Sequence, residues 1–497
     1  MPRLVAPFAP ANLAALAAPA VVLVLVAPAH AADSPFTVGS TGEVRYLASL
    51  PPDFVVDALG TTVGQGAVLE QRYRVGLGLA AKGWRVSTEW DLFTGQIAGD
   101  AWDLTGTQDV RNRGEIGVLD ADSFVARRAA IEGTIGHVAF EGGWMTADWG
   151  LGMVANNGAR TPTFGHNAFG DRVVRARAAV RPRAGEDPLV VFALDRVIDD
   201  ENARWDLGQV AWQGAAAVVR TKGETKGGGT LVYRDQTEAD HLRATHAIML
   251  DLYGETGGEA PSGRQWHAGI EAAAIGGQTT RLLTYNSPDG VAIASAGATG
   301  YVAMASAKRR TTLTLRAGWA SGDGDPADEV THDFTFDRDY DVGMVLFDEY
   351  QGAIAAQAYT LATDPEHTGV PSAGVDALVN EGAFHGASFV QPVVDVVPTD
   401  WLSLRFGVLG AVATAPITHP YYTFRNGGVP TNQVGLATSG YGLGTELDWA
   451  ARIHAPDGRR LAMELLLQGG YARPTVANGN PDGDWLSLHT ATVRVGW

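Results

Sequence analysis

Arginines and carboxylates recur two residues apart in this sequence, and they are the residues best suited to chemistry. Arg72 and Arg74 form one such pair, and Glu89 and Asp91 form another. In an extended strand, residues two apart project to the same face. Rows of guanidinium groups can guide anions, whereas guanidinium groups beside carboxylates form a structural network of ion pairs. The sequence leaves both interpretations open for the inward-facing set that this spacing predicts: Arg72, Arg74, Arg85, Glu89, Asp91, Arg175, Arg177, Arg316, Arg405, Glu446, Asp448, Arg452 and Arg494.

A glycine-rich acidic segment is a second candidate site. Asp323, Asp325 and Asp328 offer carboxylate oxygens, which are the ligands that calcium prefers. The ligand spacing of an EF-hand loop is absent, and a solvated acidic loop is the simpler interpretation. The chain has no cysteine, which excludes disulfides and thiolate metal sites. Apart from a structural calcium at these aspartates, we expect no cofactor.

Catalysis has little support in the sequence. Ser487 and His489 share one strand face, but they are two residues apart on a single strand and no third member of a triad is evident. Neither a G-x-S-x-G elbow nor an H-E-x-x-H motif occurs. We therefore expect that the protein is not an enzyme, with a hydrolase as the remaining alternative.

The elements that must position these residues are strands. Trp84, Val86 and Trp90 alternate with polar neighbours, and the same alternation recurs over residues 441–453. Soluble sandwiches also alternate, but here the apolar faces carry aromatic residues near their ends and the opposite faces mix glycine with charge. That distribution is typical of a transmembrane β-barrel with aromatic girdles and a wet lumen.

The connections between strands alternate in length. Short turns near Lys82-Gly83, Gly133–Gly136 and Pro456–Gly458 alternate with long polar stretches such as residues 95–120 and 321–384. Short periplasmic turns and long outer loops are the barrel pattern. We predict an all-β, antiparallel barrel of about 18 strands, or about 16 if a hairpin is lost between residues 235 and 263. A loop as long as 321–384 is expected to fold over or into the mouth as a constriction.

The two ends of the chain carry targeting signals. Arg3, an apolar stretch over residues 13–26 and the Ala29-His30-Ala31 ending predict a cleaved signal peptide over residues 1–31, followed by one barrel over residues 32–497. The final residue, Trp497, resembles the terminal aromatic that the outer-membrane assembly machinery recognises. The formal net charge of −18 argues against a nucleic-acid partner.

Two segments resemble known barrel groups. The run from Gly143 to Gly152, followed by Asn156 and Asn157, resembles a strand-to-loop signature of outer-membrane proteins from myxobacteria and their relatives. The run from Ala320 to Asp328, followed by Phe334-Thr335-Phe336, is similar to a loop entry in alginate-export porins. Those porins are channels with a basic lumen for an acidic polysaccharide, so the resemblance implies a porin-like barrel.

The sequence therefore predicts a porin in the outer membrane of a Gram-negative bacterium. Its expected partners are membrane lipid, the assembly machinery and a small hydrophilic solute or polysaccharide, and the solute is expected to be anionic or saccharide-like. A non-conducting barrel that serves as a surface adhesin or scaffold is the main alternative class.

The leader generates the first test. We expect mature protein extracted from outer membranes to begin at Ala32, because the small residues at Ala29 and Ala31 fit the signal-peptidase site. Intact mass spectrometry measures this directly. A mass that retains residues 13–26 would show that the apolar stretch is an anchor.

Overall fold

The computed structural model describes residues 36–56, 60, 62–63, 66–99, 124–166, 170–182, 188–220, 223–308, 310–363, 382–437, 440–455, 461–480 and 483–497. The expected signal peptide and its cleavage site lie outside these residues, as do most of the expected loop 95–120 and the Pro456–Gly458 turn.

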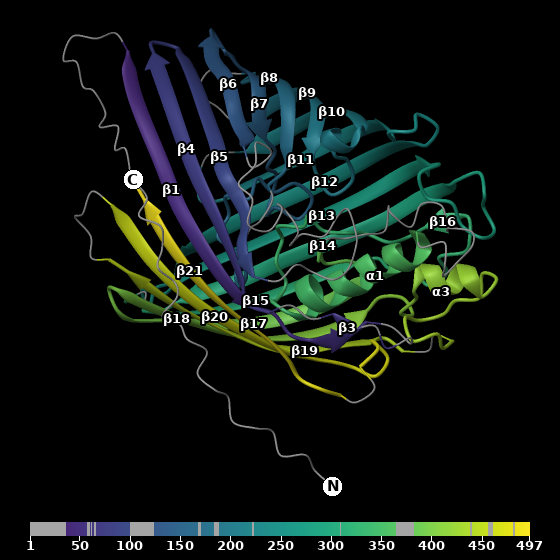
Figure 1. The fold of residues 1–497 in the computed structure, drawn as a ribbon. Coiled ribbons are helices and arrows are strands. Elements are labelled where there is room, and N and C mark those ends of the chain that lie inside the picture. The colour runs from purple at the N-terminus through teal and green to yellow at the C-terminus, as the bar shows by residue number, and fades with distance from the viewer. Residues whose placement is uncertain are drawn as a thin grey trace.

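The described chain forms one closed antiparallel barrel of 18 strands (Figure 1). Closure follows from strand β1, which pairs along one edge with β4 and along the other with β21. The barrel strands are β1 (Thr37–Leu50), β4 (Val68–Ala81), β5 (Trp84–Gly99), β6 (Val125–Ile135), β7 (Val138–Thr146), β8 (Arg172–Val180), β9 (Leu189–Asp199), β10 (Val210–Arg220), β11 (Lys226–Thr237), β12 (Ala244–Glu259), β13 (Gln265–Thr279), β14 (Val291–Ala305), β15 (Thr311–Ala320), β17 (Ala387–Thr399), β18 (Leu402–Ala413), β19 (Gly442–His454), β20 (Ala462–Pro474) and β21 (Leu486–Gly496).

The predicted all-β antiparallel fold is thereby confirmed, including the larger strand count. The uncertain region, residues 235–263, holds strand β12, which pairs with β11 on one side and β13 on the other and is joined to them by a loop at residues 238–243 and a turn at 260–264. The turn expected near Gly133–Gly136 is present and consists of Gly136 and His137, because β6 continues through Ile135.

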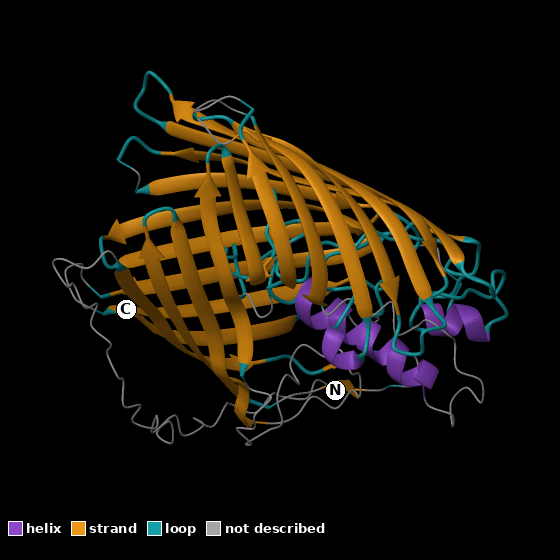
Figure 2. Ribbon diagram, turned by 90° about the horizontal axis from the view of Figure 1, so that it is seen from above, coloured by secondary structure: helices purple, strands orange, loops and turns teal. Residues whose placement is uncertain are grey.

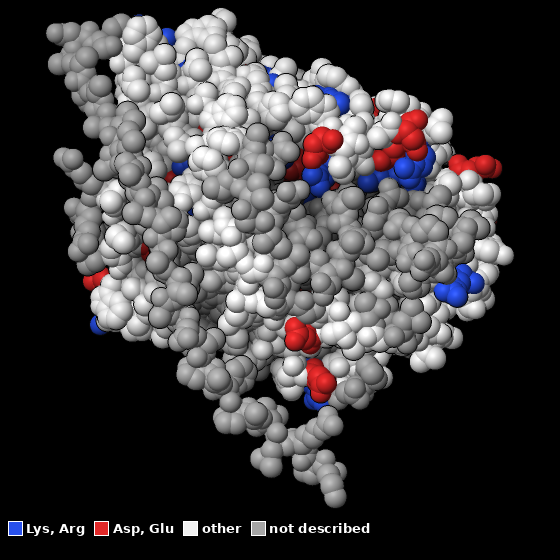
Figure 3. Space-filling model, viewed as in Figure 1, with Lys and Arg blue, Asp and Glu red and all other residues white. Residues whose placement is uncertain are grey.

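Alternation assigns the two faces of each strand. On β12, Ile248, Leu250 and Leu252 are about half exposed on the outer wall, whereas Asp251 between them is fully buried inside. Leu447 is likewise exposed on the outer wall, and Leu466 lines an internal cavity. Both positions agree with the alternation of outward and inward residues along each strand, which we call parity. In the space-filling view most of the described surface is uncharged, and the charged side chains that show lie in a few clusters (Figure 3).

The remaining elements lie in the long loops at one end of the barrel, which we call the long-loop end. They are the hairpin β2 (Phe54–Val55) and β3 (Thr62–Val63), the turns η4 (Trp205–Leu207) and η5 (Leu346–Gln351), the short strand β16 (Val330–Thr331), and the helices α1 (Gly352–Thr363) and α3 (Pro420–Arg425). Helices α1 and α3 contact each other at this end (Figures 1 and 2). Among the described residues, the helices are too short or too polar to cross a membrane.

The C-terminal residue completes the ladder between the last strand and the first. The Trp497 amide donates to the Gly42 carbonyl at 3.0 Å, and the Gly42 amide donates to the Trp497 carbonyl at 3.2 Å. A Cβ added to Gly42 would overlap the Trp497 ring at 1.9 Å, so a glycine is required beneath the terminal indole.

Neighbouring residues on β12 test the assignment of faces. We expect Leu250→Arg to destabilise the membrane-inserted barrel by about 2–4 kcal/mol, because its guanidinium would face lipid near the middle of the strand. The matched change, Met249→Arg, faces a cavity that already holds charged groups and should cost much less. Denaturant unfolding in lipid vesicles measures both. Equal losses would contradict the assignment.

Candidate functional site: a lumen narrowed by two loops

The long loop between β15 and β17 enters the lumen in its described parts, residues 321–363 and 382–386, and a wall carboxylate anchors it there. Glu446 of β19 is fully buried, and its two oxygens accept the amides of Met344, Val345 and Leu346 at 2.5–2.9 Å. These amides lie at the start of the short helix η5. The first amides of a helix have no acceptor within it, so they bind an anion readily. Glu446 was predicted to line the pore, and the structure shows that it holds the loop instead.

An apolar cluster fixes the same loop from the other side. Within the loop, the Phe384 ring packs against the tilted Phe336 ring at 4.7 Å and edge-on against Phe347 at 4.8 Å between ring centroids. The same ring packs edge-on against Phe389 of β17 at 5.1 Å. The expectation of a wet lumen is therefore wrong for this part of the barrel. The loop brings its own apolar residues, which the alternation of the wall strands could not reveal.

Glycines of the wall make room for the loop side chains. A Cβ added to Gly297 would lie 2.5 Å from the Phe334 ring, and one added to Gly407 would lie 2.5 Å from the Phe164 ring. A real Cβ atom cannot lie this close to a ring, so only glycine at these two positions leaves room for the aromatic side chain. The inward glycines that suggested a wet lumen are in part packing positions.

The described parts of a second loop, residues 147–166 and 170–171, also lie across the lumen. At one side the Trp149 indole donates to Asp251 of β12 at 3.0 Å, and the Leu151 amide donates to Glu271 of β13. At the other side Arg405 of β18 donates to the Thr163 carbonyl at 2.6 Å. In the sequence, the start of this loop stands out only as a motif, and no pattern there predicts that the loop folds inward.

The two loops are bonded to each other inside the barrel. The Asn156 amide donates to Asp337 at 2.6 Å, the Asp337 amide donates to the Met153 carbonyl at 2.7 Å, and the Gly170 amide donates to Asp339. Burial and the like charges of Asp348 and Asp339 raise the pKa of Asp341, in the same loop, well above its usual value. The loops thus form one packed unit that narrows the lumen.

A cavity of about 410 Å³ remains between this unit and strands β1, β4 and β17–β21, and we call it the basic cavity. Three carboxylates, Glu43, Asp395 and Glu464, lie among its lining arginines. The seven arginines that line it are Arg45, Arg72, Arg74, Arg160, Arg405, Arg452 and Arg494. Five of these seven belong to the predicted set, and parity missed Arg45 and the loop residue Arg160.

A larger cavity of about 560 Å³ lies on the side of strands β8–β14, and we call it the acidic cavity. Its charged lining residues are Asp148, Asp171, Asp195, Asp200, Glu201, Asp333 and Asp337 together with Arg175, Arg177, Arg234 and Arg281. Carboxylates outnumber arginines here, which is the reverse of the basic cavity. The predicted Arg175 is held by both oxygens of Asp195 at 2.7 Å, and Arg177 pairs with Glu141.

Three of the remaining predicted residues, Glu89, Asp91 and Arg85, lie outside the linings of both cavities. Asp91 accepts from Arg74 of the basic cavity at 2.6 Å, and Glu89 lies 3.8 Å from the same guanidinium. Arg85 pairs with Glu132 at 3.4 Å beside the Lys82-Gly83 turn.

The register of β4 and β5 places Arg85 at a different height in the barrel from Arg72 and Arg74, with which it shares the inward face. Arg74 lies opposite Asp91 in the ladder, whereas Arg85 lies opposite Ala80 at the other end of the same two strands. Arg85 is therefore not a neighbour of Arg72 and Arg74, because parity gives the face of a residue but not its height along the barrel.

Two further predicted residues support the long loop. Arg316 donates to Gln391 at 2.7 Å and to the Asp341 carbonyl at 3.1 Å, and its guanidinium lies over the Tyr340 ring. Asp448 is buried beside Glu446 in the same wall. Arg316 therefore contacts the long loop, and Asp448 lies in the wall beside the carboxylate that anchors it.

The predicted calcium ligands are not brought together. Asp323, Asp325 and Asp328 each accept a backbone amide of their own loop, at 3.0, 3.2 and 2.8 Å. Within the described part of the chain, the one group of three or more carboxylate or imidazole residues with ligand atoms all within 4.8 Å is a different one: Asp171, Glu201 and Asp337.

The fold and the lumen together define a class: a closed 18-strand barrel that resembles the OprD-family outer-membrane channels. Among solved structures, Acinetobacter baumannii OccAB1 is similar over 92% of this chain and 96% of its own, with a TM-score of 0.51 and 9% identity. Pseudomonas aeruginosa OprD is similar over 93% of this chain and 95% of its own, with a TM-score of 0.50 and 8% identity. At these identities the likeness shows a shared fold.

Neither a model of a known protein family nor a curated protein matches this chain. The resemblances to alginate-export porins and to the myxobacterial group therefore gain no support from these comparisons.

The Glu446 anchor can be tested through the loop that it holds. We expect Glu446→Ala to speed protease cleavage within residues 321–386, because three buried amides lose their acceptor at a cost of about 1–3 kcal/mol each. Limited proteolysis followed by mass mapping measures the rate. Glu132→Ala, near a short turn, is the matched control and should leave the loop unchanged. Cleavage at the wild-type rate in Glu446→Ala would show that the apolar cluster alone holds the loop.

Proposed function

We propose that this protein is a channel in the outer membrane of a Gram-negative bacterium and that it passes small hydrophilic solutes, with preference for anionic or saccharide-like ones. The observation that carries the proposal is the basic cavity, in which seven arginines and three carboxylates line one side of a closed barrel. The likeness of the fold to OprD-family channels supports the class of protein and leaves the solute open.

The charge distribution supports an anion preference. Opposed cavities of unlike charge on the two sides of a narrowed lumen create a transverse field, and low-dielectric walls focus such a field. Among the arginines that the barrel wall contributes to the basic cavity, the most exposed side chains are those of Arg494 at 40%, Arg452 at 30% and Arg405 at 29%. Their guanidinium groups are the ones that a passing solute would reach.

The outer wall supports the membrane location. Its exposed large side chains, such as Leu252, Phe192 and Val302, are each more than half exposed and apolar. Such a surface is stable only against lipid or another apolar partner. Membrane lipid is therefore the expected partner of the wall, and the assembly machinery is the expected partner of the C-terminal strand.

The apolar cluster inside the barrel favours a second candidate, a non-conducting barrel that acts as an adhesin or scaffold. In that case the packed loops would act as a plug rather than a constriction. Single-channel recording in planar bilayers separates the two, since a plugged barrel gives no conductance steps.

His489, one of the two residues that suggested a hydrolase, contacts a neighbouring aromatic residue. The His489 ring packs edge-on against Tyr471 with centroids 5.4 Å apart, and its Nε2 lies 3.5 Å from the Tyr471 hydroxyl. An aromatic contact on the outer wall accounts for this histidine without catalysis.

Selectivity gives the sharpest test of the channel. We expect the triple variant Arg405→Gln, Arg452→Gln, Arg494→Gln to shift the reversal potential toward cations, because it removes three positive charges from the basic cavity. The shift should be largest at about 0.01 M salt, where the Debye length is about 30 Å, and should fade at about 1 M, where it is about 3 Å.

Arg85→Gln removes one positive charge outside both cavities and is the control for each of the three single substitutions. It should leave the reversal potential unchanged. A conducting triple variant with wild-type ion preference at low salt would assign these arginines to the structural network.

A further inference from the structure

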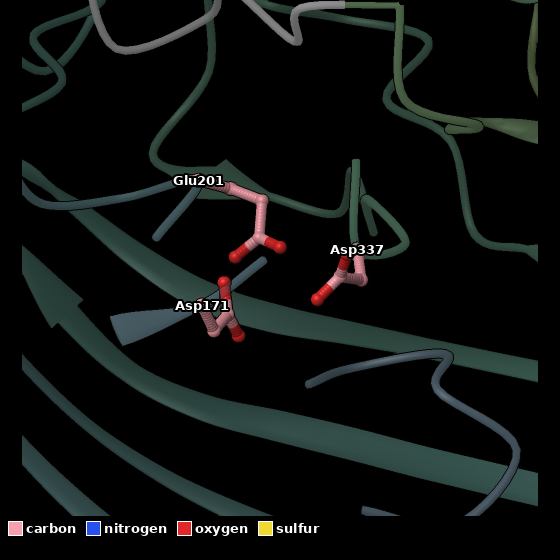
Figure 4. Close-up of side chains that lie close together, drawn as sticks. All are labelled: Asp171, Glu201 and Asp337. Atoms are coloured by element: carbon pink, nitrogen blue, oxygen red, sulfur yellow. The ribbon is translucent and has the colours of Figure 1, made fainter. Parts of the chain in front are cut away.

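We infer that Asp171, Glu201 and Asp337 form a binding site for a hard divalent cation, with calcium as the best fit, which ties the long loop to the barrel wall. The three carboxylates come from separate segments: Asp171 directly precedes β8, Glu201 follows β9, and Asp337 belongs to the long loop. Figure 4 shows the three side chains converging on one space. All three line the acidic cavity, so the space is open to an ion.

Unpartnered oxygens point to a ligand at this place. Asp171 is only 6% exposed, and its Oδ1 has no hydrogen-bond partner. Oε1 of Glu201 is also buried without a partner. A buried carboxylate oxygen that lacks a donor is costly, and coordination of a cation removes that cost.

Asp337 is held in position for the same role. Its Oδ1 accepts the Asp339 amide at 2.8 Å and its Oδ2 accepts the Asn156 amide at 2.6 Å. Each carboxylate oxygen has two lone pairs, so one stays available on each atom. The two amides therefore orient the carboxylate without using up its capacity to bind a metal.

Nearby arginines contact other carboxylates. Arg338 and Arg172 both bind Asp199, at 2.9 and 2.6 Å, and Arg234 binds Asp200 at 2.6 Å. The negative charge of the three converging carboxylates is thus only partly balanced by close ion pairs.

Electrostatics agree with a shortage of positive charge at this point. Burial and neighbouring carboxylates raise the pKa of Asp171 and of Asp337 well above the usual value, and they raise the pKa of Glu201 to about 7. A bound cation would stabilise the ionised form of all three groups.

Geometry and chemistry favour calcium over other metals. Calcium–oxygen bonds of about 2.3–2.6 Å allow two ligands of one ion to lie up to about 5 Å apart, which accommodates the observed limit of 4.8 Å. Magnesium–oxygen bonds of about 2.1 Å require a tighter set, and zinc prefers nitrogen and sulfur ligands. Water would complete the coordination of about six to eight oxygens.

A cation at this site would connect three segments of the chain. The Asp171 amide donates to the Asn156 carbonyl at 2.9 Å, so the site lies where the second loop, the β9–β10 connection and the long loop meet. An ion held by all three segments would fasten the long loop at a point across the lumen from the Glu446 anchor. Binding itself does not depend on the proposed channel function.

The test uses the full mature protein in detergent after removal of divalent ions with a chelator. Isothermal titration with calcium chloride should show one site per chain, with magnesium a weaker competitor. The double variant Asp171→Asn, Glu201→Gln should weaken calcium binding by at least about 10- to 100-fold, since losing a ligand costs no less than losing a group that orients one. Asp325→Asn, Asp328→Asn is the matched control and should bind as wild type.

A second readout keeps the test decisive if the double variant folds poorly. Glu201→Gln alone changes the least buried of the three ligands, and the mobility shift of unheated protein on SDS gels reports an intact barrel. Calcium should slow proteolysis of residues 321–386 in wild type but not in Glu201→Gln. Absence of calcium binding by wild type at millimolar concentration, or equal binding by the variants, would overturn the inference. Calcium binding by a barrel without conductance would refute the proposed function alone.

Discussion

The structure depends on closure of the backbone hydrogen-bond ladder between β1 and β21. In lipid, an unpaired strand edge would leave several amides and carbonyls without partners at a cost of several kcal/mol each, so a sheet crosses a membrane only when it closes on itself. Here β1 pairs with β21 from Glu43 to Leu50, and Trp497 extends the same ladder to Gly42. Once the sheet is closed, one face of every strand is committed to the outside and the other to the lumen.

The lumen of so large a barrel must be filled or left wet, and this protein does both. Two loops occupy the centre, held by carboxylates of the wall that accept loop amides, as Glu446 and Glu271 do. Hydrogen bonds between a charged acceptor and buried amides are stronger than neutral ones, which suits anchors that must hold irregular backbone away from water. Glycines beneath Phe334 and Phe164 then allow aromatic packing where a strand surface would otherwise be too crowded.

The charges that remain are sorted by side. Arginines dominate the cavity next to β1 and β17–β21, and carboxylates dominate the cavity next to β8–β14. Many of these groups are in ion pairs, such as Arg72 with Glu43 and Arg175 with Asp195. The arginines on which the proposed anion preference depends are therefore the same residues that form the structural network of ion pairs.

The sequence by itself determined most of the strands, their approximate number and the face of most strand residues, because inward and outward positions alternate with a period of two. Trp84 and Val86 are exposed outside at 47% and 44%, as that period requires. It could not give the height of a residue, so Arg85 was grouped with Arg72 although the register separates them. Nor could it give the contacts of the loops, which carry no period. Asn156 and Asp337 are 181 residues apart in the chain, and only the closed barrel brings them together.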